Sequence, residues 1–138
     1  MPNKTLCIIP ARGGSKRIPR KNIKDFCGKP IIAYSIETAI SSGLFDEVMV
    51  STDDSEIADI AKQYGAKVPF MRSKKASDDH ATTADVLLEV LEKYEIEFSK
   101  NFKHLCCMYA CAPLIQQEAF QRAHQKIISE ALDTVFPI

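Results

Sequence analysis

The sequence of 138 residues lacks any apolar run that approaches the roughly 20 residues of a membrane span. It also lacks an excess of either charge, because 18 Lys and Arg side chains balance 18 Asp and Glu side chains. A general nucleic-acid-binding protein is normally basic overall, so this balance argues against that class. The first apolar run, residues 6–9, is too short for the hydrophobic region of a secretory signal. We therefore expect a cytoplasmic protein with no membrane partner and no nucleic-acid partner.

Patterns typical of disulfide frameworks and zinc sites are missing as well. The five cysteines form no C-x-x-C pair and are odd in number, and the three histidines are scattered along the chain. Three of the cysteines lie within apolar, strand-like runs. We expect reduced thiols without a catalytic role, as is usual in the cytoplasm.

Short apolar runs alternate with segments of helical periodicity along the chain. Residues 6–9, 48–50 and 105–109 are predicted strands, apolar throughout as strands buried on both faces should be. A chain of this length suffices for one compact core. The alternation of strands and helices predicts an α/β fold with a mainly parallel sheet and helices on its faces.

Three helical segments separate or flank these strands. Pro30 is expected at the first position of a helix that Gly43 ends. Asp53, with Glu56 three residues later, resembles the capping pair of a second helix. A third helix is expected to begin at Thr83 or at the residue before it. Its expected core-facing residues are Ala84, Leu87, Leu88 and Leu91.

The segment that follows the first strand, residues 10–22, is rich in cations and glycine. It holds five of the 18 basic residues and two adjacent glycines, and no acidic residue precedes Asp25. Glycines let backbone N–H groups approach phosphate oxygens, and Lys and Arg neutralise the phosphate charge. The P-loop and dinucleotide-binding patterns are both absent. On charge alone a solvated loop is the commoner outcome, but a place after a buried strand favours a polyphosphate site.

Residues 8–22, Ile-Ile-Pro-Ala-Arg-Gly-Gly-Ser-Lys-Arg-Ile-Pro-Arg-Lys-Asn, resemble the N-terminal signature of the acylneuraminate (CMP-nonulosonic acid) cytidylyltransferases. The resemblance continues through residues 26–36, 45–54 and 65–78. It implies a Rossmann-like three-layer αβα fold of the nucleotide-diphospho-sugar transferase type. It also implies transfer of CMP from CTP to a nonulosonic acid, with release of pyrophosphate and with Mg2+ as cofactor, for surface glycan or flagellin glycosylation.

The same resemblance assigns roles to individual residues. The catalytic clamp on the triphosphate would be Arg12, Lys16 and Lys21. The substrate-binding residues would be Ala11, Arg12, Gly13, Gly14, Ser15, Lys16, Lys21, Asn22, Arg72, Thr83 and Tyr109. Asp53 and Asp54 could together bind magnesium, although capping a helix is the better interpretation of this pair. The metal-binding carboxylates of the family are expected beyond residue 138.

Residues 108–115, Met-Tyr-Ala-Cys-Ala-Pro-Leu-Ile, discriminate between branches of the family. Sialic acid enzymes typically carry Leu-Gln-Pro-Thr-Ser-Pro-Leu-Arg here. Tyr109 takes the place of the Gln and Ile115 takes the place of the Arg, which resembles the pseudaminic acid branch. Less polar side chains at these two positions fit a deoxy sugar with a methyl terminus. Sialic acid and legionaminic acid remain the alternative acceptors.

The chain ends in the apolar run at residues 135–138, so more of the domain is expected to follow. Residues 1–138 would then be the N-terminal nucleotide-binding part of a single cytidylyltransferase domain, which is expected to form a homodimer when full length. A different class of function is a CTP-binding module without turnover. A nucleic-acid-binding protein that uses the basic segment is the weakest alternative.

Overall fold

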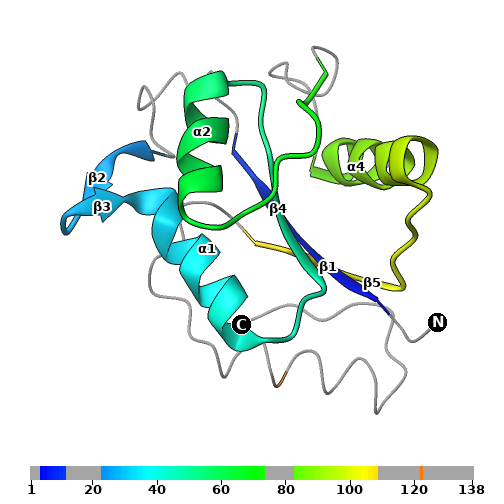
Figure 1. The fold of residues 1–138 in the computed structure, drawn as a ribbon, viewed down its shortest axis with the longest axis horizontal. Coiled ribbons are helices and arrows are strands. Elements are labelled where there is room, and N and C mark those ends of the chain that lie inside the picture. Colours follow the sequence, from blue (N-terminus) through cyan, green and yellow to red (C-terminus); the bar gives the residue numbers. More distant parts are fainter. Residues whose placement is uncertain (1–3, 12–22, 74–82, 109–121, 123–138) are drawn as a thin grey trace.

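The structure is a computed structural model that describes residues 4–11, 23–73, 83–108 and 122 (Figure 1). Several of the sequence predictions concern residues outside these ranges, including the proposed clamp residues Arg12, Lys16 and Lys21. No helix within the described ranges has both the length and the apolar character that crossing a bilayer requires.

The sheet has the strand order β4–β1–β5, and both strand pairs are parallel. Its described strands are β1 (Thr5–Pro10), β4 (Glu47–Ser51) and β5 (His104–Cys107). The register places Ile8 beside Met49 on one side and beside Cys107 on the other. The first strand of the chain is therefore the middle strand, as its uninterrupted apolar sequence predicts.

Helices cover both faces of this sheet. They are α1 (Ile31–Ser42), α2 (Ser55–Gln63) and α4 (Thr83–Phe98). Side chains alternate between the faces of a strand, so Cys7 and Ile9 of β1 pack in the core under α1 and α2, whereas Leu6 and Ile8 pack under α4. Figure 1 shows α1 and α2 on one side of the strands and α4 on the other. The α/β prediction, with a parallel sheet between helical layers, is confirmed.

Helix α1 begins one residue later than the sequence predicts. Pro30 precedes the helix as its N-cap residue and pairs within a short strand, rather than occupying the first helical position. Ile32 and Ile36 are buried as expected. Gly43 ends the helix at φ 68°, and its N–H donates to the carbonyl of Ile40 at 3.2 Å. Glycine is favoured after the last turn of a helix because it adopts the left-handed conformation at little cost.

Helix α4 faces the sheet with a different stripe from the one predicted. Its buried residues are Val86, Val90 and Tyr94, spaced four residues apart. Ala84 and Leu88, expected inside, are exposed, and the other two expected residues are half-buried. The ring of Tyr94 packs edge-on against two phenylalanine rings. This aromatic contact sets the rotation of the helix.

A small antiparallel hairpin, which the sequence analysis did not predict, stands before α1. Its strands are β2 (Asp25–Phe26) and β3 (Lys29–Pro30). The two turn residues, Cys27 at φ 52° and Gly28 at φ 92°, both have the left-handed conformation of a two-residue hairpin turn. The hydroxyl of Tyr34 in α1 donates to the carbonyl of Phe26 at 2.5 Å. The first turn of α1 therefore holds the hairpin in place.

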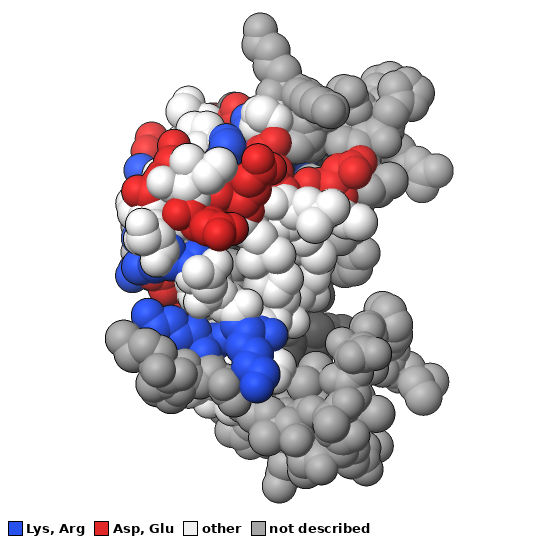
Figure 2. All heavy atoms as spheres, turned by 90° about the vertical axis from the view of Figure 1, so that its right-hand side faces the viewer, with Lys and Arg blue, Asp and Glu red and all other residues white. Residues whose placement is uncertain are grey.

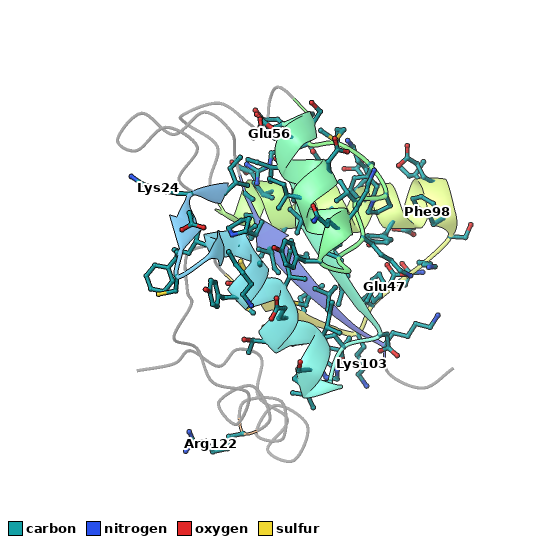
Figure 3. All side chains as sticks on the ribbon, turned by 60° about the vertical axis from the view of Figure 1, so that its left-hand side comes forward. Lys24, Glu47, Glu56, Phe98, Lys103 and Arg122 are labelled. Carbon is teal, nitrogen blue, oxygen red and sulfur yellow. The ribbon has the colours of Figure 1, made fainter. Side chains whose placement is uncertain are left out.

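The amino end of β4 carries a nearly buried carboxylate. Glu47 is 8% exposed and lies 2.5 Å from Lys100 Nζ and 3.5 Å from Lys67 Nζ. Burial acts to raise the pKa of Glu47, but the hydrogen bond from Lys100 and the charge of Lys67 hold it below its usual value. Figure 3 shows Glu47 and Lys103 near this end of the sheet, away from Glu56.

Candidate functional site

The carboxyl ends of the three parallel strands meet at one edge of the sheet. Ala11, which follows β1, is completely buried, and its backbone N–H donates to the carbonyl of Ser51 at 2.9 Å. On the other side of β1, the N–H of Met108 donates to the carbonyl of Ile8 at 3.0 Å. In Figure 3 this edge lies toward Glu56, in the first turn of α2. Open α/β sheets bind their ligands at this edge, near the strand where the order reverses.

Arg72 is fixed to the same edge by both its backbone and its side chain. Its N–H donates to the carbonyl of Thr52 at 2.8 Å. Its guanidinium donates through Nη2 to the carbonyl of Ser51 at 2.9 Å and through Nε to the Ser51 hydroxyl at 3.3 Å. The Ser51 carbonyl therefore accepts from both Ala11 and Arg72. Two residues that the sequence assigns to one site, 61 positions apart, meet at a single oxygen atom.

Helix α4 holds the residues on either side of Arg72. The N–H of Ser73 donates to Glu89 Oε1 at 3.0 Å, and its hydroxyl donates to Oε2 of the same carboxylate. One turn later, Lys93 Nζ donates to the carbonyl of Met71 at 2.8 Å. Burial acts to raise the pKa of Glu89, but the Ser73 hydrogen bonds and the charges of Lys93 and Arg72 hold it below its usual value. Glu89 is thus an ionised acceptor at neutral pH.

Three of the predicted substrate-binding residues are described. Ala11 and Arg72 come together at Ser51, and Thr83 is the first residue of α4. The others lie outside the described residues: Arg12, Gly13, Gly14, Ser15, Lys16, Lys21, Asn22 and Tyr109. Both segments that hold them adjoin this edge in sequence, since residue 12 follows Ala11 and residue 109 follows Met108.

One carboxylate of the acidic pair after β4 caps the helix that follows. Asp54, and not Asp53 as predicted, caps α2, because its Oδ1 accepts from the N–H groups of Glu56 at 2.9 Å and Ile57 at 3.1 Å. Across the described ranges, no group of three or more His, Cys, Asp or Glu side chains could hold a metal ion.

Two cysteines of neighbouring strands contact each other within the sheet. Cys7 is buried within β1, opposite Cys106 of β5 in the register. The hydrogen bond with Cys106, followed by burial, raises the pKa of Cys7 well above its usual value. A thiol that stays protonated is a poor nucleophile. The same hydrogen bond lowers the pKa of Cys106, so this argument applies to Cys7 alone.

The outer surface of α4 is acidic. Figure 2 shows acidic side chains gathered where this helix lies. The exposed acidic residues of α4 are Asp85, Glu92, Glu95 and Glu97. Such a surface repels a phosphate backbone, so this face does not supply the broad cationic area that nucleic-acid binding requires.

Sequence reasoning missed Ser51 and Glu89, which hold Arg72 and its neighbour. Ser51 belongs to a segment that resembles the family, but its contribution is largely a backbone carbonyl, which any residue type supplies. Glu89 looks like an ordinary charged position on a helix. Its separation from Ser73 by 16 residues gives no local sequence signal.

The sequence profile of the cytidylyltransferase family matches residues 6–135. The chain belongs to the cytidylyltransferase family. The strand edge described above is therefore part of a cytidylyltransferase fold. The resemblance noted in residues 8–22 is confirmed at the level of the family.

Individual cytidylyltransferases show how far the likeness extends. Pseudaminic acid cytidylyltransferase of Campylobacter jejuni is 51% identical over 133 residues, which cover 96% of this chain and 57% of that protein. CMP-N,N'-diacetyllegionaminic acid synthase of Legionella pneumophila is 36% identical over 96% of this chain and 58% of its own length. The structure of CMP:2-keto-3-deoxy-manno-octonic acid synthetase complexed with CTP matches with a TM-score of 0.76 and 28% identity, over 94% of this chain and 49% of that one. This cytidylyltransferase chain thus spans about half the length of the relatives it matches.

Proposed function

We propose that the protein transfers CMP from CTP to a nonulosonic acid and releases pyrophosphate. The family supports nucleotidyl transfer, and the shared Ser51 carbonyl, which joins Ala11 to Arg72, is the observation that carries the proposal. It brings two residues of the expected CTP site to the sheet edge where α/β proteins bind nucleotides. Residues 1–138 would be the N-terminal nucleotide-binding part of one cytidylyltransferase domain.

The proposed roles divide the site into a phosphate part and a base part. Arg12, Lys16 and Lys21 would clamp the triphosphate, where cations stabilise charge that grows on the bridging and leaving oxygens. The proposed contacts to the rest of CTP and to the acceptor come from Ala11, Gly13, Gly14, Ser15, Asn22, Arg72, Thr83 and Tyr109. Among these, Arg72 presents a planar, permanently charged guanidinium that Ser51 holds at the edge of the sheet.

The reaction needs no protein nucleophile. A hydroxyl of the sugar acid attacks the α-phosphorus of CTP, a new P–O bond forms, and the bond to pyrophosphate breaks. The protein contributes by aligning the two substrates and by neutralising the leaving group. Mg2+ is part of the proposal as the cofactor that would neutralise phosphate charge when bound, and the described residues include no cluster of three or more ligating side chains for it.

Pseudaminic acid is the proposed acceptor. Support comes from the relative with 51% identity, which is a pseudaminic acid cytidylyltransferase, and from Tyr109 and Ile115 in the discriminating segment. Burying an extra methyl group gains about 0.8 kcal/mol, and a wrongly buried hydroxyl costs roughly 1–3 kcal/mol. Legionaminic acid is the second candidate because the Legionella synthase is 36% identical. The proposed assembly is a homodimer of the full-length protein.

A CTP and Mg2+ assay against a panel of sugar acids tests this proposal. We expect pyrophosphate release with pseudaminic acid to exceed release with legionaminic, sialic and octulosonic acids. Preference for another nine-carbon acid would overturn the choice of acceptor only. Binding of CTP without turnover of any acid would instead favour the alternative of a CTP-binding module.

A further inference from the structure

The side chain of Glu89 contacts the segment that carries Arg72, although it belongs to α4. We infer that Glu89 is a positioning residue for Arg72 in CTP binding, acting through Ser73. This inference rests on the proposed function, because it assigns Glu89 to the same nucleotide site.

The geometry shows that the segment 71–73 is held from two sides. Arg72 itself is bound to the end of β4 through the carbonyls of Thr52 and Ser51. The neighbouring Ser73 donates both its N–H and its hydroxyl to the Glu89 carboxylate. A carboxylate that accepts two donors from one residue fixes both the backbone and the side chain of that residue.

Lys93 is a second residue of α4 that contacts the segment 71–73. It lies one helical turn after Glu89, with Nζ 3.8 Å from Glu89 Oε1, and it also donates to the carbonyl of Met71. The residues before and after Arg72 are thus tied to successive turns of one helix. Since α4 packs on the sheet through Val90 and Tyr94, the segment is connected to the rigid core rather than left as a free loop.

The consequence for binding is that the guanidinium is preorganised. An arginine side chain loses considerable rotamer freedom when it becomes fixed, and a site that fixes it beforehand avoids that cost on binding. Loss of Glu89 would remove the two hydrogen bonds that fix the backbone and the side chain of Ser73. We therefore expect loss of Glu89 to weaken CTP binding without removing any group that touches the reacting phosphorus.

The test compares Glu89→Ala with Glu89→Gln in the full-length protein, and uses Glu92→Ala, an exposed glutamate of the same helix, as the matched control. We expect Glu89→Ala to raise the KM for CTP roughly tenfold with kcat within about threefold, as loss of hydrogen bonds to a charged group predicts. Glu89→Gln, which keeps an acceptor oxygen, should recover part of this loss. Glu92→Ala should match the wild type.

A double-mutant cycle with Arg72→Ala separates positioning from a general structural effect. If Glu89 acts through Arg72, adding Glu89→Ala to Arg72→Ala causes no further loss of CTP affinity. Equal losses in both backgrounds would overturn the inference. Ser73→Ala, which leaves α4 intact, should produce a smaller loss of the same kind and covers the case in which Glu89→Ala does not fold.

Failure of the proposed function gives a different result. A folded wild-type protein that does not bind CTP in calorimetry overturns the function itself. A wild type that binds CTP, together with a folded Glu89→Ala variant of unchanged affinity, overturns only the positioning role. A rise in KM confined to the sugar acid would also contradict it.

Discussion

At the scale of single residues, the site depends on atoms that the sequence does not display. Ala11 and Arg72 are recognisable from their places in a family pattern, and the structure brings them together. What joins them is the carbonyl of Ser51, and backbone carbonyls are the same in every residue. Only the register of β1 with β4 determines which carbonyl lies there. The sequence could therefore name Ala11 and Arg72 as candidates for one site, but it could not show how Arg72 is anchored.

The proposed phosphate clamp gives the sharpest prediction at this scale. Lys21→Ala should lower CMP-sugar formation by orders of magnitude, because an amine that neutralises the leaving pyrophosphate acts mainly in the transition state. The far-ultraviolet circular dichroism spectrum and the thermal unfolding midpoint should stay unchanged. Pyrophosphate release from full-length protein is the measurement, and unchanged turnover would contradict the role of Lys21.

At the scale of elements, strands were easier to predict than helix faces. The apolar run of β1 admits one interpretation, a strand buried on both sides. In α4, apolar residues occupy neighbouring positions around the helix, so the stripe through Ala84 and Leu88 and the stripe through Val86 and Val90 both have helical spacing. The stripe that faces the sheet is the one that continues to Tyr94, because the Tyr94 ring packs against Phe70 and Phe102. Both phenylalanines lie outside α4, so the helical spacing alone does not reveal this contact. The hairpin before α1 was missed because its strands have only two residues each.

The cap of α2 provides a prediction about one element. Asp54→Ala removes the acceptor of two backbone N–H groups and should lower the free energy of unfolding by about 1 kcal/mol. Asp54→Asn should retain most of the stability, because asparagine caps helices comparably. Asp59→Ala, at an exposed position within α2, is the matched control and should cause no loss. Urea unfolding measures all three variants, and an equal loss in Asp54→Ala and Asp59→Ala would contradict the capping role.

At the scale of the whole molecule, two ionised carboxylates link helix α4 and its flanking segments to the sheet. Glu47 pairs with Lys100, just after α4, and Glu89 holds the segment that follows β4. Both have a pKa below the usual value of a glutamate. The parallel sheet and its helical layers follow from sequence periodicity. These long-range charge contacts do not, because their partners lie 53 and 16 residues apart.

The stability of the molecule should consequently depend on acid pH in a defined direction. A carboxylate with a lowered pKa in the folded state stabilises the protein fully above its unfolded-state pKa, about 4.3, and loses this effect as pH falls through the lower folded-state pKa. Between these values each such group contributes a slope of up to about 1.4 kcal/mol per pH unit. Glu47→Gln should therefore show a shallower decline below about pH 4.3 in chemical unfolding series. Identical slopes for variant and wild type would contradict this account.

The position of β1 in the middle of the sheet also bears on the order in which the chain can fold. Its first neighbour, β4, ends at residue 51, but its second neighbour, β5, begins only at residue 104. During synthesis one edge of β1 therefore stays unpaired until the chain has been made as far as β5. A largely apolar strand with an open edge is a template for pairing with other chains. The strand that leads into the proposed nucleotide site is thus also a segment open to misassociation in the nascent protein.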